Sequence, residues 1–397
     1  FDKVAELIGE AQYEVLYSTM WYDAAENKDS PGAVIADAVA DLYAKVRDNP
    51  QQYPRGMMVR ILLDNPPELA RGEATGQLWS LLGDLRQAGV EKMIDSEIGW
   101  RLEVADYKGS LPHSHVKTVI IDGQTAVAAG FNTTYNHFPV DHSSGKGTGR
   151  FDMGLQITGP AAQASLRMFD DMWQGANQRG CLNLNPPYGL PWQATCYEQT
   201  ATADHVPEVL KFYLPGGSSS AFSLYRSRVH DAADKQAAAA LRAAQESIDI
   251  IQVNFTLDLI CNLNIVFDIC PAGISPEYMP ALIAAAENGA KIRIIIKPSP
   301  FEGIENTVAI DALSETLQDL GLEDQFKVRF YEQDMHPKVA LIDNQLLIVG
   351  SQNFHYSAYG SGAGLNEYSF AVEDPQAVED FSRAFDFIWQ QSVPAGG

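Results

Sequence analysis

The stretch that decides the fold of this chain runs from His115 to Asp122 and reads HVKTVIID; it returns from His336 to Asp343 as HPKVALID. Both copies have the form H-x-K-x4-D. Alternate residues of a β-strand point to the same face, so each His projects with its Lys. The apolar residues that follow predict a buried strand, in which an imidazole and an ammonium group are costly unless they face a cleft or find partners.

The same residues follow each copy at matched spacing, which indicates an internal duplication. An Asn lies 17 positions after each His, an acidic residue comes later, and a Pro stands eight positions after that acid. Each half then closes on a Phe-x3-Trp pattern. The residues are Asn132, Asp152, Pro160, Phe169 and Trp173 in the first half, and Asn353, Glu367, Pro375, Phe385 and Trp389 in the second.

Short apolar runs separated by alanine-rich helical stretches predict β-α-β units. The runs are 15–17 and 59–63 in the first half, and 248–251 and 292–296 in the second. We therefore expect an α/β fold of two similar lobes packed with pseudo-twofold symmetry. Each lobe would be a mainly parallel sheet flanked by helices, with the active site at the lobe interface. The expected domains are 1–180, a connecting segment 181–225 rich in Pro, Gly, Asn and Ser, and 226–397.

Composition narrows the class of protein. The 397 residues are 46% hydrophobic and 20% charged, which excludes a disordered chain. The net charge of −23 disfavours nucleic acid as a partner. No uncharged apolar stretch is long enough to span a membrane, so we do not expect an integral membrane protein.

The four cysteines form two close pairs, Cys181 with Cys196 and Cys261 with Cys270. Their spacing does not fit a zinc site. We expect two disulfides formed in an oxidising compartment, although three pairings and free thiols stay open. The chain begins with Phe1 and shows no leader, which fits a secreted or extracytoplasmic protein whose leader has been removed, or a trimmed chain.

Two His/Lys pairs and two Asn amides around one point would suit a phosphate diester. The lysines would neutralise phosphoryl oxygens and the amides would donate hydrogen bonds to a five-coordinate transition state. One His would attack phosphorus and the other would protonate the leaving alkoxide, giving a covalent phosphohistidine. This mechanism needs no metal or other cofactor; a metal site using His113 and His115 is the weaker interpretation. We expect Asp122 and Asp343, at the strand ends, to form structural ion pairs.

These motifs resemble those of the phospholipase D superfamily, whose signature is H-x-K-x4-D with a G-S-x-N turn. The segment 350–353 matches that turn, whereas Gly130 replaces its serine in the first half. The stretches 122–126, 158–162 and 289–294 look most like secreted bacterial phospholipases D. The resemblance implies His115 as nucleophile and His336 as general acid/base. It also implies that Glu367 holds His115 and Asp152 holds His336, with phosphate bound by Lys117, Lys338, Asn132, Asn353 and Ser351.

The expected function is a phospholipase D that hydrolyses phosphatidylcholine-like lipids to phosphatidic acid and alcohol, with transphosphatidylation. Its partners would be the phospholipid, a water or alcohol acceptor, and a peripheral membrane or micelle surface; we expect a monomer. The alternatives are a nuclease or other phosphodiesterase with the same site, a phosphatidyltransferase like cardiolipin synthase, and a catalytically inactive lipid-binding module.

Overall fold

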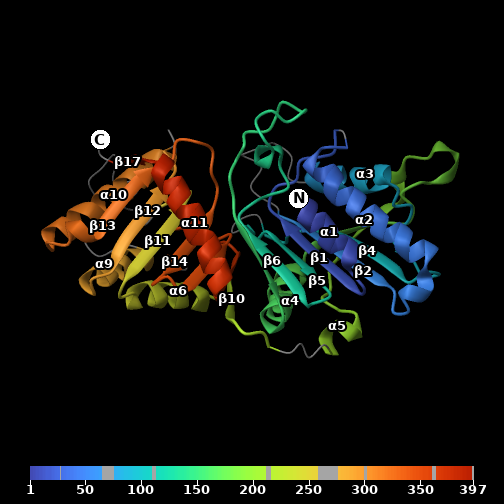
Figure 1. The fold of residues 1–397 in the computed structure, drawn as a ribbon. Helices are drawn as coiled ribbons and strands as arrows, with labels where there is room; N and C mark the ends of the chain where they lie inside the picture. The colour runs from blue at the N-terminus through green and yellow to red at the C-terminus, as the bar shows by residue number, and fades with distance from the viewer. Residues whose placement is uncertain are drawn as a thin grey trace. The chain divides into compact units, whose positions relative to one another are not determined.

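A computed structural model describes residues 1–26, 28–64, 76–109, 113–211, 216–257, 276–298, 302–359 and 364–395, the side chains of 302–304 excepted. It divides the chain into two compact units (Figure 1). The first unit comprises residues 1–128, 132–149 and 156–217. The second unit comprises 218–397 together with 129–131 and 150–155, two short pieces from the first half of the sequence.

The first unit is built on a nine-stranded sheet of order β7-β6-β5-β1-β2-β4-β8-β9, with β3 paired to β4. Strands β1, β2 and β4 are parallel neighbours, and β5 and β8 flank them in antiparallel orientation. The strands are β1 (Glu14–Thr19), β2 (Met57–Leu63), β3 (Ile94–Asp95), β4 (Trp100–Asp106), β5 (Thr118–Ile121), β6 (Thr125–Ala129), β7 (Gly154–Thr158), β8 (Asn177–Cys181) and β9 (Cys196–Thr200). The helices are α1 (Asp2–Glu10), α2 (Pro31–Asp48), α3 (Gly76–Ala88), α4 (Pro160–Trp173) and α5 (Pro207–Lys211), with 3-10 turns η1 (Pro50–Gln52), η3 (Tyr135–His137), η4 (Pro187–Gly189) and η5 (Trp192–Thr195).

The second unit repeats this plan with an eight-stranded sheet of order β10-β16-β15-β14-β11-β12-β13-β17. Here β11, β12 and β13 are the parallel neighbours. The strands are β10 (Ser220–Arg226), β11 (Ser247–Gln252), β12 (Lys291–Ile296), β13 (Phe326–Phe330), β14 (Lys338–Ile342), β15 (Leu346–Gly350), β16 (Glu367–Glu373) and β17 (Val393–Pro394). The helices are α6 (Ala232–Ala243), α9 (Tyr278–Glu287), α10 (Glu302–Asp319) and α11 (Pro375–Gln391), with the 3-10 turn η6 (Glu323–Gln325).

The predicted α/β fold of two similar units with helix-flanked sheets is confirmed, but both sheets are mixed, so the prediction that they are mainly parallel was wrong. The strand after each H-x-K segment turns back at once: β5 pairs antiparallel with β6, and β14 with β15. Each connection begins with two residues of positive φ. They are Asp122 (53°) and Gly123 (63°) between β5 and β6, and Asp343 (51°) and Asn344 (52°) between β14 and β15. Such pairs form tight hairpin turns. A parallel partner would need a crossover of a dozen or more residues, which these short connections cannot supply.

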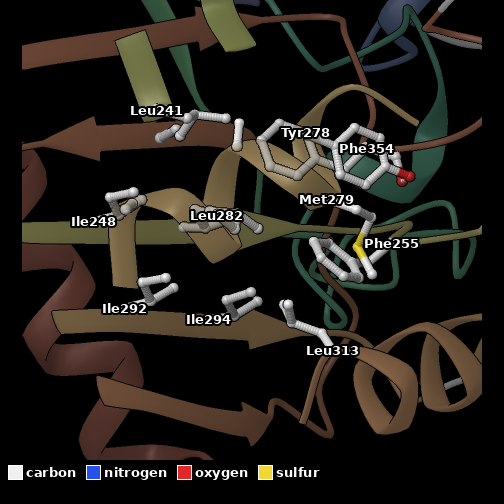
Figure 2. Close-up of a cluster of buried hydrophobic side chains, with 14 of the residues drawn as sticks. Leu241, Ile248, Phe255, Tyr278, Met279, Leu282, Ile292, Ile294, Leu313 and Phe354 are labelled. Atoms are coloured by element: carbon white, nitrogen blue, oxygen red, sulfur yellow. Dashed lines mark hydrogen bonds between the residues drawn. The ribbon is translucent and has the colours of Figure 1, made fainter. Parts of the chain in front are cut away.

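The core of the second unit lies on one face of β11 and β12, beneath α6, α9 and α10 (Figure 2). Ile248 and Ile250 of β11 lie opposite Ile292 and Ile294 of β12, and all four side chains are buried against this face. An aromatic group closes one end of the core, where the rings of Tyr278 and Phe354 stack 4.8 Å apart. The alanine-rich stretches predicted as helical form α6 and α9, and alanines make up much of the face that each helix buries.

Each sheet carries an arginine at the same position of its second parallel strand, with an acidic residue and a tryptophan as neighbours. Arg60 of β2 is fully buried, bonds Glu103 at 2.6 Å and lies 5.3 Å from the ring of Trp173. Arg293 of β12 bonds Asp249 and lies 5.6 Å from the ring of Trp389. In both units a Phe stacks on that Trp with centroids 5.7 Å apart. Each Phe-x3-Trp pattern therefore places its Trp beside an arginine that is ion-paired; Arg60 is fully buried, whereas Arg293 is partly exposed.

The segment predicted as a connection, 181–225, contains regular structure. Strand β9 pairs with β8 in the first sheet and β10 pairs with β16 in the second. A disulfide joins Cys181 to Cys196, which confirms one of the two predicted pairs. The pair Cys261–Cys270 lies outside the described residues. No helix among the residues described is long and apolar enough to cross a membrane.

Candidate active site

Each H-x-K segment enters its hairpin at the same place in the sheet. Thr118 lies opposite Ser18 of β1, and Lys338 lies opposite Gln252 of β11. His115 and His336 therefore lie past the carboxyl ends of β1 and β11. This edge is where open α/β sheets bind their ligands.

The two lysines make the same contact with their histidines. Lys117 Nζ donates to the backbone oxygen of His115 at 2.6 Å, and Lys338 Nζ donates to that of His336 at 2.6 Å. Lys338 Nζ also lies 2.7 Å from Nδ1 and 3.0 Å from Nε2 of His336. Both lysines are buried. The second copy thus holds an ammonium group directly beside an imidazole, as predicted, although His336 precedes β14 and the pair is not set by strand alternation.

A carboxylate from the first half of the sequence holds the second histidine. Asp152 Oδ2 lies 2.9 Å from His336 Nδ1, with both residues in the second unit. Backbone bonds fix the approach, since the His336 amide donates to Phe151 O at 2.7 Å and the Phe151 amide donates to Asp334 O at 3.0 Å. The predicted pairing of Asp152 with His336 is confirmed. A carboxylate on Nδ1 fixes the ring orientation and presents Nε2 for proton transfer.

The missing serine of the first copy has a steric explanation. A Cβ on Gly130 would lie 2.2 Å from Asp152 Oδ1, closer than real Cβ contacts come. In the second copy the equivalent Ser351 donates its hydroxyl to Glu367 Oε2 at 2.5 Å and accepts from the Tyr368 amide at 3.0 Å. Glu367 is one methylene longer than Asp152. Glycine accommodates the shorter acid, whereas serine bonds the longer one.

The other predicted phosphate ligands differ in their contacts. Asn132 is buried and its Oδ1 accepts from the Trp21 amide at 3.2 Å. The Oδ1 of Asn353 is buried and has no hydrogen-bond partner among the described residues; as a carbonyl oxygen it accepts hydrogen bonds and cannot bond a phosphoryl oxygen, a role left to the amide nitrogen. Ser351 was predicted to bind phosphate, but its hydroxyl bonds Glu367 and the backbone instead.

Asp122 and Asp343 are structural, but neither forms the predicted ion pair with any residue that the structure describes. Asp122 accepts the backbone amides of 12, 13 and 14 at 2.7–2.9 Å. Asp343 accepts those of 245, 246 and 247 at 2.8–3.1 Å. Each aspartate joins the hairpin turn to the start of the parallel strand beside it. Burial raises the pKa of Asp122 despite these bonds, whereas for the more exposed Asp343 the bonds outweigh burial and lower the pKa.

Sequence reasoning missed Asp64, which comes directly after β2. Its Oδ2 lies 2.7 Å from His113 Nδ1, and its Oδ1 accepts the Ser114 amide at 2.6 Å. Burial opposes protonation of His113, but the hydrogen bond and charge of Asp64 outweigh it and raise the pKa. His113 thus has a carboxylate partner of its own. The position of Asp64 directly after a buried apolar run was the feature of the sequence that could have identified it as a site residue.

The predicted site residues fall into two groups. The first unit holds His115, Lys117 and Asn132. The second unit holds His336, Lys338, Asp152, Asn353, Ser351 and Glu367. The pairing of Glu367 with His115 joins residues of different units and stays a prediction, as does the convergence of the two histidines on one phosphorus.

Comparisons with known proteins match the second half of the chain to a family model and nearly the whole chain to a solved structure. Residues 238–389 match the family model described as "Cardiolipin synthase, PLD-like domain". The structure of phosphatidylserine synthase from Haemophilus influenzae Rd KW20 aligns with 99% of this chain and 84% of its own length, at a TM-score of 0.61 and 14% identity. That likeness shows a common fold along nearly the whole chain.

Smaller structures align with less of the chain. Nuc from Salmonella typhimurium, described as a phospholipase D family member, covers 45% of this chain and 100% of its own at 20% identity and a TM-score of 0.35. NucT from Helicobacter pylori covers 45% and 99% at 19% identity and a TM-score of 0.31. No curated protein matched the sequence significantly.

Proposed function

This chain belongs to the phospholipase D superfamily, whose enzymes act on phosphodiester bonds, and we propose that it is a phospholipase D. It hydrolyses the distal phosphodiester bond of phosphatidylcholine-like lipids to phosphatidic acid and free alcohol. It also exchanges headgroups when an alcohol competes with water. The observation that carries the proposal is the arrangement of Asp152 and Lys338 around the imidazole of His336.

The proposed reaction has two displacements at phosphorus. His115 attacks phosphorus, the bond to the headgroup oxygen breaks, and His336 Nε2 gives its proton to the departing alkoxide. A water or alcohol then loses its proton to His336 and attacks the phosphohistidine, which releases phosphatidic acid or a new phospholipid. Asp152 stabilises the protonated His336, and the two lysines balance charge on the phosphoryl oxygens.

The net charge supports a lipid over a nucleic acid substrate. A field of −23 repels a polyanion, whereas a zwitterionic headgroup carries no net charge to repel. A nuclease would need a basic track flanking the site. The sequence around both H-x-K segments has no cluster of Lys and Arg.

A phosphatidyltransferase is the second candidate, because the matched family model and the full-length structural relative are both named for such enzymes. It would use the same phosphohistidine but pass the phosphatidyl group to an alcohol in preference to water. The acceptor therefore separates the two candidates. Product ratios measured with glycerol or serine at increasing concentration decide between them.

Variants of the two histidines test the mechanism. We expect His115→Ala to abolish turnover and His336→Asn to slow it while labelled phosphatidyl accumulates on His115. His230→Asn, an exposed histidine, is the control and should keep wild-type rates. Label on His336 would reverse the roles. Loss of activity in excess chelator, restored by zinc or calcium, would refute the metal-free mechanism.

A panel of substrates tests the lipid assignment. Vesicles or micelles with choline, ethanolamine, serine or glycerol headgroups are assayed beside single-stranded DNA. We expect release of headgroup from choline lipids and no cleavage of DNA. Cleavage of DNA with no turnover of any lipid would overturn the proposal in favour of a nuclease.

A further inference from the structure

The disulfide Cys181–Cys196 closes a loop whose composition is unusual for this chain. The 17 residues from Cys181 to Tyr197 contain no Asp, Glu, Lys or Arg, although one residue in five of the protein is charged. Besides Leu184, four large apolar or aromatic residues lie between the two cysteines: Leu182, Tyr188, Leu190 and Trp192. We refer to residues 182–195 as the disulfide loop.

The most apolar side chains of the disulfide loop point into solvent. Tyr188 is 99% exposed, Leu182 75% and Leu190 60%. Tyr188 also has φ of 61°, a left-handed conformation that costs a residue with a side chain about 1–2 kcal/mol. No burial of its own side chain offsets this cost. All three belong to one loop closed by a single disulfide, and a contiguous exposed apolar surface marks an interaction site.

The loop is held to the first unit by its ends and by two anchors. Leu184 is fully buried; its amide donates to Glu91 O at 3.1 Å and its oxygen accepts from Arg86 Nε at 2.8 Å. Trp192 packs against Trp79 with ring centroids 5.7 Å apart. The display of Tyr188 and Leu190 between these anchors is therefore pre-organised, and binding through it loses little conformational entropy.

One anchor brings the loop to the edge of the sheet that carries His115. Trp79 lies in the first turn of α3, which follows β2 and leads into the parallel strand β4. A helix that links parallel strands starts at their carboxyl edge. His115 lies past the carboxyl end of β1, the neighbour of β2. Trp192 thus reaches toward the edge of the first sheet that carries His115, whereas both ends of the disulfide loop and Leu184 lie toward the opposite, amino edge, because β8 runs antiparallel to β4.

We propose that the disulfide loop docks the enzyme on a zwitterionic phospholipid surface, with Leu182, Tyr188 and Leu190 entering the interface. The proposal rests on the proposed function, since a phospholipase D finds its substrate in such a surface. Tyr and Trp favour the headgroup level, and Leu adds apolar area below it. The absence of charge from the loop suits a neutral surface, which a protein of charge −23 approaches without repulsion.

Binding to vesicles tests the loop without any need for turnover. The full chain carrying His115→Ala, which keeps the lipid intact, is sedimented with sucrose-loaded dioleoylphosphatidylcholine vesicles. Adding Leu182→Ser, Tyr188→Ser and Leu190→Ser should weaken partitioning by about 100-fold, since half-immersing each large side chain contributes a factor of about five. The affinity should also change little between low and high salt, because no ion pair contributes.

A matched control removes the same kind of side chain elsewhere. Leu210, Val229 and Phe387 are 60–78% exposed and lie outside the loop. Their combined replacement by Ser should leave vesicle binding within about threefold of the parent. An equal loss in both triple variants, no loss in either, or no binding by the parent would overturn the proposal. So would a loop variant that changes self-association in sedimentation while vesicle binding stays intact.

Activity separates this inference from the proposed function. With His115 present, the loop variant should hydrolyse a monomeric short-chain phosphatidylcholine at the wild-type rate and act slowly on vesicles. Wild-type protein that binds vesicles through the loop but turns over neither substrate would refute the proposed function and leave the docking surface standing.

Discussion

Substituting Gly130 with alanine should displace the carboxylate that holds His336. The new Cβ would lie 2.2 Å from Asp152 Oδ1 and 2.9 Å from Cγ. Relief to ordinary van der Waals contact moves the carboxylate by about 1 Å. The present 2.9 Å bond to His336 Nδ1 then stretches beyond hydrogen-bonding distance. The change is a single methyl group, yet it acts on the proposed acid/base.

The expected loss follows from the bond that is broken. A hydrogen bond to a charged group is worth about 1.5–3 kcal/mol. If that interaction stabilises the protonated imidazole in the transition state, kcat/KM falls by about 10- to 150-fold. Gly130→Ser, which restores the serine of the second copy, should be impaired at least as strongly. Making the two turns alike is thus expected to damage the enzyme.

The assay compares kcat/KM on a monomeric short-chain diester with the melting temperature of each variant. Gly83→Ala is the control, because a Cβ there meets no atom within 4 Å. In the double variant with Asp152→Asn, Gly130→Ala should add little further loss, since both act on one contact. Wild-type kinetics for Gly130→Ala beside an impaired Asp152→Asn, or additive losses in the double variant, would refute the reasoning.

Two further predictions concern stability. His205 lies between Glu14 (2.7 Å) and Asp170 (2.8 Å), and although burial opposes it these carboxylates raise its pKa from 6.5 to about 9. Because the folded pKa exceeds the unfolded value, the stabilisation is complete below pH 6.5 and is lost as pH rises through 9. In urea unfolding, the free energy of unfolding should fall by about 2 kcal/mol between pH 6.5 and 9, allowing for partial screening of the charges. In His205→Gln it should stay constant over this pH range. An equal fall in that variant would show that His205 is not the group responsible. Asp122→Ala should cost about 3 kcal/mol in the same assay, because it leaves three backbone amides without their acceptor; a loss below 1 kcal/mol would show that water replaces the carboxylate.

Much of the fold could be predicted because it is encoded in local patterns. The apolar runs at 59–63 and 292–296 became the central strands β2 and β12. The matched Phe-x3-Trp patterns became matched stacks on Arg60 and Arg293. The direction of neighbouring strands was harder to predict, because it depends on turn geometry. Two positive-φ residues after Ile121 form a hairpin, so the next strand is antiparallel in a sheet that was predicted to be mainly parallel.

The sequence by itself determined which chemical groups this protein carries and how often. Its duplicated His, Lys, Asn and acid spacing specifies the chemistry, because each H-x-K segment leads directly into a buried strand that fixes where it lies. Only the tertiary structure decided that Asp152 joins His336 across 184 positions of chain, that Gly130 makes room for it, and that Asp122 binds backbone instead of a cation. Such contacts depend on how distant segments pack, and no local periodicity records that.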